Sequence, residues 1–466
     1  MLNGNRRHGE SVRPGWQWRV AAVLGVVVLA ASCTGGATNA PTSAPTSTAA
    51  ATGTPAPTPA PTFPTGPVAL TMWVTADGST KAGFEKYFSQ YQKTRPNVSM
   101  TIEEFPFLDL HDKLSIALQA GTGAPDLALP EISRFAVLLK GSQVGLVDLT
   151  DRIKAAGMSL VSSLQANYTY QGKTYGVQTD VNPVQLFYRS DIFQQAGIKT
   201  PIATWADYVA AGQLLKQKTG KSMMAIETTD YDVWTPIMLQ YGCNFFDTSG
   251  KVTLDALQCH KAFNFLVSLV QTYKIAIPAP GGDQYNPTFW GAYGKGDVAS
   301  IWGAGWMLSI LEGFIPDLKG KWAAQPLPVA PPDAPWDTST VGGNAAVITN
   351  QSKNVDVAWD FIRWLMLDKP LPDVVYGVPN NTKLWTDPIF QKPSDYLGGQ
   401  VIGKLWLDQT QELIKPGAPY LNPDPNNPTA YDIFVRDALG PAINGDKSAD
   451  DALSAAVAEL KSTIGQ

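Results

Sequence analysis

VALTMWVT at residues 68–75 predicts a buried β-strand, because apolar and β-branched residues run through it without a charge. A helix is expected over residues 80–95, where aromatic residues recur at the spacing of one helix face: Phe84, Tyr87, Phe88 and Tyr91. A second strand over 98–102, a helix over 110–120 and a short strand over 126–129 follow. The order β-α-β-α-β predicts an α/β fold, with a parallel sheet covered by helices.

Further helices are expected across the rest of the chain, over 257–273, 356–367 and 448–464. Another should start after Thr204 and run to about Lys218. Thr204 and Asp207 have the spacing of a capping box, in which each side chain bonds the other residue's backbone N–H.

The composition limits both the number of domains and the kind of partner. The chain has 466 residues, which allows two or three domains, and a formal net charge of −5. Nucleic-acid binders gather lysine and arginine to neutralise phosphates, so the negative balance argues against that class. Only 16% of the residues are charged, and the chain contains 14 tryptophans.

The N-terminus has the pattern of an export signal. Four arginines within the first 19 residues precede twelve uncharged apolar residues at 20–31 (VAAVLGVVVLAA), a run too short to span a bilayer. The small residues directly before Cys33 resemble the lipobox of bacterial lipoproteins, in which the cysteine carries the lipid. We therefore expect a lipoprotein signal peptide at 1–32 and lipidation at Cys33. A plain signal peptide that happens to precede a cysteine is the alternative.

Residues 33–67 are expected to form a tether. Residues 34–67 carry no charge and consist mainly of Thr, Pro and Ala. Such a segment cannot bury enough apolar surface to fold, and its prolines favour an extended, semi-rigid chain. A tether of this kind would hold a folded body away from the membrane.

Cys243 and Cys259 are the cysteines left once Cys33 carries lipid. An exported protein tolerates disulfides, so we favour a Cys243–Cys259 bridge over two buried thiols. Such a bridge would stabilise the fold by about 3 kcal/mol in the chain-entropy account.

Signals for an enzyme are weak. The chain has no P-loop, no Gly-x-Ser-x-Gly elbow, no His-Glu-x-x-His and no Cys-x-x-Cys. His111 and His260 are expected on helix surfaces, as histidines without a ligand or catalytic role. We therefore predict no catalytic residues, no metal site and no cofactor.

Tryptophan carries the main hint about a ligand. Several tryptophans stand at the ends of predicted segments rather than inside them: Trp73, Trp234, Trp290, Trp302, Trp306 and Trp336. An indole face stacks well on a sugar ring, and neighbouring carboxylates accept hydrogen bonds from hydroxyl groups. Core packing is the more common role for any single tryptophan, so only the set points to a carbohydrate.

Short motifs along residues 68–466 resemble the maltose-binding-like, sugar-binding members of extracellular solute-binding protein family 1, which serve ABC importers. The motifs are Arg95-Pro96-Asn97-Val98, GTGAPD at 121–126, Tyr175-Gly176 with Asp180 and then Phe187-Tyr188, GKGDVASIWGAGW at 294–306, and Gly342-Gly343-Asn344. The chain departs from the family pattern at Gln178, where proline is common, at Arg189, where asparagine is usual, and at Ser300-Ile301, where Ala-Met is usual. Gln178 and Arg189 flank the expected cleft, so we do not expect the ligand to be one of the family's well-studied sugars.

The resemblance implies a two-lobed, periplasmic-binding-protein-like fold of type II, with the ligand cleft between the lobes. Lobe 1 would hold 68–181 and about 325–375, and lobe 2 would hold 182–324 and about 376–466. The ligand-binding residues that it implies are Trp73, Asp77, Glu131, Asp180, Trp234, Trp302, Trp306, Gly343 and Asn344. Glu131 and Asp180 would accept hydrogen bonds from hydroxyl groups, and Trp306 would be the stacking platform.

The implied function is capture of a mono- or oligosaccharide by lobe closure and delivery to the permease subunits of an ABC importer. The protein would be a monomer, lipid-anchored on the outer face of the cell membrane. Two alternatives remain at this point: an envelope glycoside hydrolase or polysaccharide-processing enzyme, and an adhesive or structural lipoprotein.

Overall fold

The computed structural model describes residues 63–466 except 77–79, 140–143, 368–376, 416 and 423. The chain divides into two units, Met1–Ala60 and Pro61–Gln466, and the fold below belongs to the second. The predicted signal peptide, Cys33 and Asp77 lie outside the described residues. Within the described part, every helix is too short or too polar to cross a membrane.

The first sheet has five strands in the order β2-β1-β3-β13-β6. Its strands are β1 (Val68–Thr75), β2 (Val98–Phe105), β3 (Leu127–Ala128), β6 (Val177–Gln178) and β13 (Ala345–Ile348). Strand β1 pairs in parallel with β2 and β3, whereas β13 pairs antiparallel with β3 and β6. The predicted β-α-β-α-β unit with a parallel sheet is therefore confirmed.

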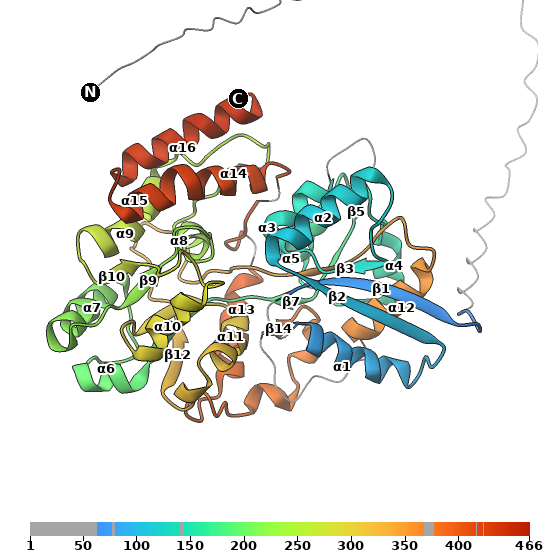
Figure 1. Ribbon diagram of the computed structural model, residues 1–466, viewed down its shortest axis with the longest axis horizontal. Coiled ribbons are helices and arrows are strands. Elements are labelled where there is room, and N and C mark those ends of the chain that lie inside the picture. Colours follow the sequence, from blue (N-terminus) through green and yellow to red (C-terminus); the bar gives the residue numbers. More distant parts are fainter. Residues whose placement is uncertain (1–62, 77–79, 140–143, 368–376, 416, 423) are drawn as a thin grey trace, which may run out of the picture. The chain divides into compact units, whose positions relative to one another are not determined.

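Helices cover both faces of this sheet (Figure 1). Helices α1 (Thr80–Gln92) and α12 (Val355–Leu367) pack on one face, where Tyr91 and Phe361 meet with ring centroids 5.2 Å apart. Helix α2 (Phe107–Ala120) lies on the other face and buries Leu110 and Leu114. The shorter elements around the sheet are α3 (Ile132–Phe135), η1 (Ala136–Leu139), α4 (Thr150–Ala156), α5 (Ser162–Gln165), η2 (Ala166–Tyr168), β4 (Thr169–Tyr170) and β5 (Lys173–Thr174).

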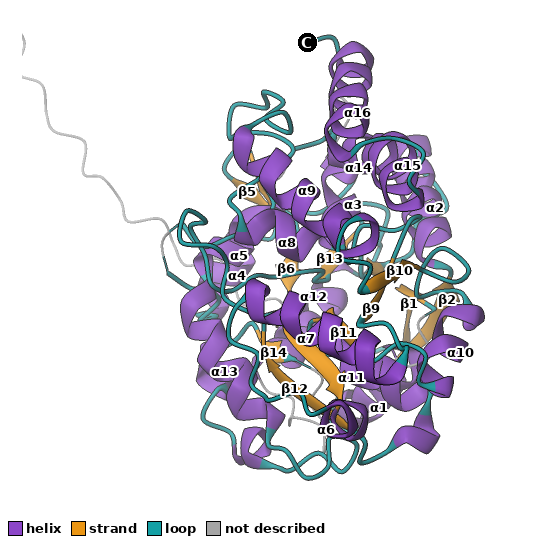
Figure 2. Cartoon of the chain, turned by 90° about the vertical axis from the view of Figure 1, so that its left-hand side faces the viewer, coloured by secondary structure: helices purple, strands orange, loops and turns teal. Residues whose placement is uncertain are grey.

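A second, antiparallel sheet has the order β11-β8-β12. It consists of β8 (Gln185–Arg189), β11 (Ser300–Gly303) and β12 (Trp322–Pro326), and a parallel pair, β9 (Met224–Ile226) and β10 (Ala276–Pro278), lies in the same region. Helices surround these strands (Figure 2). They are α6 (Ser190–Ala196), α7 (Trp205–Thr219), α8 (Trp234–Gln240), α9 (Leu257–Gln271), α10 (Pro287–Lys295), α11 (Trp306–Phe314), η3 (Pro316–Leu318), η4 (Thr382–Leu384), η5 (Pro388–Gln391), α13 (Ile402–Leu413), α14 (Asn427–Phe434), η6 (Val435–Leu439), α15 (Gly440–Asn444) and α16 (Ala449–Ile464).

The capping box predicted at the start of α7 is confirmed. The Thr204 hydroxyl accepts the backbone N–H of Asp207, and the Asp207 carboxylate accepts the backbone N–H of Thr204, both at 3.1 Å. These two bonds satisfy N–H groups that the first turn of a helix leaves unpaired.

Three chain segments cross between the two sheets. Strand β7 (Asp180–Val181) pairs with β14 (Val378–Pro379), and Pro183 forms a bridge with Thr340. The chain was predicted to pass back into lobe 1 near residue 325. In the structure β12 and Val329 still pair with strands and residues of the second region, so the chain crosses later, near Thr340. The predicted boundary near 375 lies outside the described residues.

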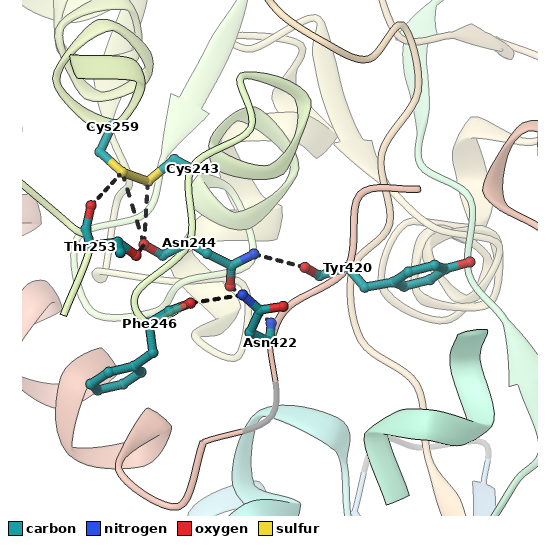
Figure 3. Close-up of a disulfide and its surroundings, with 7 residues drawn as sticks. All are labelled: Cys243, Asn244, Phe246, Thr253, Cys259, Tyr420 and Asn422. Atoms are coloured by element: carbon teal, nitrogen blue, oxygen red, sulfur yellow. Dashed lines mark hydrogen bonds between the residues drawn. A yellow bond between two sulfur atoms is a disulfide. The ribbon is translucent and has the colours of Figure 1, made fainter. Parts of the chain in front are cut away.

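Cys243 and Cys259 form a disulfide with an S–S distance of 2.04 Å (Figure 3). The bridge joins the segment after α8 to the first turn of α9. Both cysteines are buried in the core of the second region.

Candidate functional site

A small cavity lies where the carboxyl end of β3 meets the second region. One side comprises residues after β3 and from the crossings, including Glu131, Ser133, Gln178 and Gly342. The opposite side comprises Tyr231, Thr235, Tyr420, Leu421 and Tyr431, which all belong to the second region. We call these two sides the first wall and the second wall, and the space between them the cleft. Carboxyl ends of strands are where α/β sheets place their ligands.

Glu131 is the central polar residue of the first wall. Its Oε2 accepts the backbone N–H of Ser133 at 2.7 Å, which caps α3, and it also accepts the hydroxyl of Tyr231 on the second wall at 3.0 Å. Its Oε1 is buried and has no hydrogen-bond partner among the described residues. Burial raises the pKa of Glu131 to about 7, although these hydrogen bonds oppose the shift.

His111 supports Glu131 from behind, which corrects the prediction of a surface histidine. His111 is only 2% exposed, and its Nε2 accepts the backbone N–H of Glu131 at 2.9 Å. Its Nδ1 therefore carries the proton and donates to the carbonyl oxygen of Phe107 at 2.7 Å. Burial lowers the pKa of His111 to about 4, so the ring is neutral at pH 7. His260 lies partly exposed and pairs with Asp450.

A further cavity lies within the second region, beside the residues of the second wall. This cavity is lined by Glu227, Asp232, Gln284, Trp302 and Trp306, among others, and we include these residues in the second wall. The backbone N–H of Gln284 donates to Glu227 Oε1 at 3.2 Å, and its side-chain amide donates to Asp232 Oδ2 at 2.7 Å. Glu227 Oε2 and Gln284 Oε1 are buried without a hydrogen-bond partner among the described residues.

These carboxyl groups repel one another as well as being buried. Burial, and then the charges of Asp230 and Asp283, raise the pKa of Glu227 well above its ordinary value. Burial raises the pKa of Asp230 to about 6, with a further contribution from Asp283. The pKa of Asp232 is raised in the same way by burial and by Asp230 and Glu227. Among the described residues that line the two cavities there is no lysine or arginine, although the charge of nearby Arg134 opposes part of the pKa rise of Asp230.

The two walls touch in this conformation. Arg134 of the first region forms an ion pair with Asp432 of the second at 3.0 Å, and the rings of Phe107 and Tyr285 lie 6.3 Å apart with planes 16° from parallel. The two cavities measure about 20 and about 10 Å³, close to the space of one water molecule each. A sugar ring needs far more room, so a ligand can enter only when the walls separate.

The predicted tryptophans divide between the cleft and the core. Trp306 is half-buried, lines the second cavity and begins α11. Its Nε1 lies 3.4 Å from the point where a Cβ on Gly342 would stand, so a glycine there allows close approach. Trp302 lines the same cavity but is 3% exposed, and its Nε1 donates to the carbonyl oxygen of Val233 at 2.9 Å.

Trp234 and Trp73 lie among protein side chains instead. Trp234 is fully buried and stacks on Phe434 with ring centroids 4.8 Å apart. Trp73, at the end of β1, is 8% exposed and packs edge-on against Phe105. Both rings are therefore covered by protein in this conformation, which does not favour the ligand contacts predicted for them.

Asp180, Gly343 and Asn344 lie at the crossings beside the first wall. Asp180 accepts the hydroxyl of Thr179 at 2.8 Å and the amide of Asn182 at 2.7 Å. Gly343 has φ +127° and its carbonyl oxygen accepts the backbone N–H of Ile132 at 2.9 Å. Asn344 forms a bridge with Glu131. Asp180 and Gly343 thus brace the first wall, and Asn344 is joined to it.

Several cleft residues were not predicted from the sequence, namely Glu227, Tyr231, Asp232, Gln284, Tyr420 and Tyr431, whereas Gln178 was expected beside the cleft. The run ETTDYD at 227–232 directly follows the buried strand β9. Acidic and aromatic residues after a buried strand were the available signal, and the strand itself had not been predicted. Among the described residues, no group of three or more His, Cys, Asp or Glu is placed to hold a metal ion.

Comparison with known proteins agrees with this architecture. The sequence profile of the family described as bacterial extracellular solute-binding protein matches residues 76–370. The arabinooligosaccharide-binding protein of Bacillus subtilis (strain 168) is 31% identical over 409 residues, which cover 85% of this chain and 93% of that protein. The arabinooligosaccharide-binding protein of Halalkalibacterium halodurans is 30% identical over 378 residues, covering 79% and 84%.

A solved structure gives the same fold. The ABC transporter associated binding protein from B. animalis subsp. lactis Bl-04, in complex with β-1,6-galactobiose, matches with a TM-score of 0.71 at 20% identity. The match covers 85% of this chain and 97% of that chain. The fold is thus the two-lobed α/β fold of type II periplasmic binding proteins. The profile match covers more than half of the chain and describes binding proteins rather than enzymes, so the hydrolase alternative is not supported. The chain belongs to the bacterial extracellular solute-binding proteins.

Proposed function

We propose that this protein captures an oligosaccharide outside the cytoplasm by closing its two walls around it, and delivers it to the permease of an ABC importer. The observation that carries the proposal is a set of buried oxygen atoms without hydrogen-bond partners among the described residues. They come from both walls: Glu131 Oε1, Gln178 Oε1, Glu227 Oε2 and Gln284 Oε1. Leaving such atoms unpaired costs about 1–3 kcal/mol each.

A carbohydrate supplies what these atoms lack. Each sugar hydroxyl can donate one hydrogen bond, so a saccharide between the walls would satisfy several of these acceptors at once. Trp306 and the tyrosines of the second wall would pack on the ring faces. The relatives named for binding arabino-oligosaccharides favour a pentose oligomer as the first candidate.

The residues that we assign to the ligand are a revised form of the predicted set. Glu131 and Trp306 would contact the sugar directly, and Asp180, Gly343 and Asn344 would hold the crossings in place beside it. Trp73, Trp234 and Trp302 would support the walls from behind. We add Glu227, Tyr231, Asp232, Gln284, Tyr420 and Tyr431 as contacts from the second wall.

Closure would follow from ligand binding. A saccharide that bonds both walls stabilises the closed form over the open form by its differential affinity for the two. The permease would then recognise the closed form. We also propose a lipid at Cys33, the uncharged tether at 33–67 and a monomeric protein held at the outer face of the membrane.

A thermal-shift screen over neutral mono- and oligosaccharides, including arabino-oligosaccharides, tests the proposal. A binding sugar at about 100 times its Kd should add about 2.7 kcal/mol to the free energy of unfolding and raise the Tm. The sugar should remain intact after prolonged incubation, as chromatography of the mixture would show. If no saccharide in the panel raises the Tm, the proposed function is wrong.

A further inference from the structure

One part of the second wall belongs to no helix or strand. Tyr420 and Leu421 line the cleft cavity opposite Glu131, in the irregular segment at 417–422 between α13 and α14. A segment without regular structure must be held by contacts from outside itself if its side chains are to keep a fixed place.

Asn244 supplies two of those contacts with a single side chain, beside a bond from the Tyr420 hydroxyl to the carbonyl oxygen of Leu413 and one from the Asn427 amide to that of Asn422. Its Nδ2 donates to the carbonyl oxygen of Tyr420 at 2.8 Å, and its Oδ1 accepts the backbone N–H of Asn422 at 2.9 Å. The amide thus bonds the backbone on both sides of Leu421, as a neighbouring strand would. Figure 3 shows Asn244 between the disulfide and this segment, with the Tyr420 ring pointing away from the disulfide. Asn422 adds a bond from its own amide to the carbonyl oxygen of Phe246 at 2.8 Å.

The disulfide fixes the backbone that carries Asn244. Asn244 directly follows Cys243, which is bonded to Cys259 at the start of α9. The carbonyl oxygen of Asn244 also accepts the hydroxyl of Thr253 at 2.9 Å, and the backbone N–H of Thr253 donates to the carbonyl oxygen of Phe245 at 2.9 Å. The loop at 243–246 is therefore tied to the core of the second region on one side and to the cleft segment on the other.

We propose that Asn244, held by the Cys243–Cys259 disulfide, is a positioning residue for ligand binding: it fixes Tyr420 and Leu421 in the wall of the cleft without touching the ligand. The inference rests on the proposed function, because it assigns a role within the same cleft. It also predicts that affinity for a sugar depends on a residue on the far side of the wall.

The first experiment needs no ligand. Hydrogen–deuterium exchange should show that Asn244→Ala raises the exchange rate of the amides at 420–422 at least tenfold, with the first sheet unchanged. Asn264→Ala is the matched control, because Asn264 also makes two side-chain hydrogen bonds in the second region, to His260 and Asp450, away from the cleft. Unchanged exchange at 420–422 in Asn244→Ala would overturn the proposal.

The second experiment is a double-mutant cycle on affinity, with arabinotriose as the titrated probe. Asn244→Ala should raise the Kd about tenfold and Asn264→Ala should not change it. Because Asn244 acts through Tyr420 and Leu421, the double variant Asn244→Ala/Tyr420→Ala should lose less affinity than the sum of the two single losses. Additive losses would contradict the positioning role.

Removing the disulfide gives an independent check. Cys243→Ser with Cys259→Ser should increase exchange at 420–422 as Asn244→Ala does. If this variant fails to fold, Asn244→Ala still decides the question. If arabinotriose does not bind the wild-type protein, the pentose candidate is wrong. The cycle is then run with the saccharide that the thermal-shift screen identifies. The exchange result stands in either case, so the two proposals fail separately.

Discussion

Glu131 on the first wall and Glu227 on the second are both buried carboxyl groups, but the protein surrounds them differently. Glu131 Oε2 receives hydrogen bonds from Ser133 and Tyr231, and its backbone N–H is held by a buried neutral histidine. The backbones of Gln284 and Val233 interact with Glu227, which lies near Asp230 and Asp283, whose charges oppose its ionisation. The carboxyl group of the first wall is therefore braced by its own contacts, whereas that of the second wall lies among like charges.

This difference indicates a division of labour in the cleft. Fixed groups lose little freedom when a ligand binds, so a braced wall can orient a sugar at a small entropic cost. A carboxyl group that lies among like charges gains the most from new hydrogen-bond donors, so we expect the second wall to contribute most of the affinity. The following variants test this division, from the largest expected effect to the smallest.

The largest loss is expected for Trp306→Ala on the second wall. Removing the indole should weaken sugar binding at least a hundredfold, or about 2.7 kcal/mol, because the stacking surface is lost. Isothermal titration with the saccharide found by the screen measures the change. Trp336→Ala is the control, because Trp336 is also half-buried but lines neither cavity. An affinity equal to that of the wild type would remove Trp306 from the site.

A smaller loss is expected for Asp180→Asn at the crossing between the walls. The substituted side chain would lack the negative charge that accepts hydrogen bonds from Thr179 and Asn182, so the crossing would be held less firmly. We expect at least a tenfold weaker Kd, or about 1.4 kcal/mol. Circular dichroism should show an unchanged fold, and an unaltered Kd would mean that the crossing does not contribute to binding.

The two walls should also differ in the pH range over which their carboxyl groups change the stability of the fold. A carboxyl group whose folded pKa is raised binds its proton more tightly in the folded state, so its stabilising effect is lost as the pH rises through that window. The window runs from 4.5 to about 7 for Glu131 and from 3.8 to about 6 for Asp230. His111 acts in the opposite direction, since its lowered pKa makes stability fall as the pH drops from 6.5 towards about 4.

Denaturant unfolding of Glu131→Gln and Asp230→Asn across this pH range separates the three groups. Relative to the wild type, Glu131→Gln should cancel a fall of about 3 kcal/mol between pH ~4.5 and ~7, and Asp230→Asn a fall of about 3 kcal/mol between pH ~3.8 and ~6. His111 is present in both variants and cancels from the comparison. Parallel pH profiles for wild type and variants would show that neither carboxyl group has a raised pKa.

The smallest effect is expected far from both walls. Lys319 and Asp395 form an ion pair 3.0 Å long with side chains 61% and 80% exposed. Lys319→Ala should change the free energy of unfolding by less than about 0.5 kcal/mol and leave sugar affinity unchanged. A large change in affinity would indicate that residues outside the cleft control binding.

Strands β1, β2 and β3 of the first sheet could be predicted from the sequence because their signals are local. Val68–Thr75 is a continuous apolar strand, and the aromatic face of α1 has a clear helical period. The capping box at Thr204 was equally local. The second sheet joins β8 to β11 and β12, which are far apart along the chain, and no local pattern indicates such pairs.

The cleft could be predicted only in part for the same reason. The family resemblance implied Glu131 and Trp306 as ligand-binding residues, and both line the cavities. Trp234 was implied as well, but Phe263 and Phe434 from distant helices cover its ring. His111 was expected at the surface, because its partner Glu131 comes from another element. A pattern within one segment does not show which distant elements will cover a side chain in the folded protein.

The acidic residues around the cleft also bear on its opening and closing. Besides burial and its nearer acidic neighbours, the charge of Glu131 raises the pKa of Asp232 in this conformation, because like charges in a medium of low polarity repel each other. An empty protein in this conformation must therefore either hold these charges together or bind protons, whereas a ligand would offer its hydroxyl groups as hydrogen-bond donors. We therefore expect the empty protein to adopt this conformation more readily at low pH than at neutral pH.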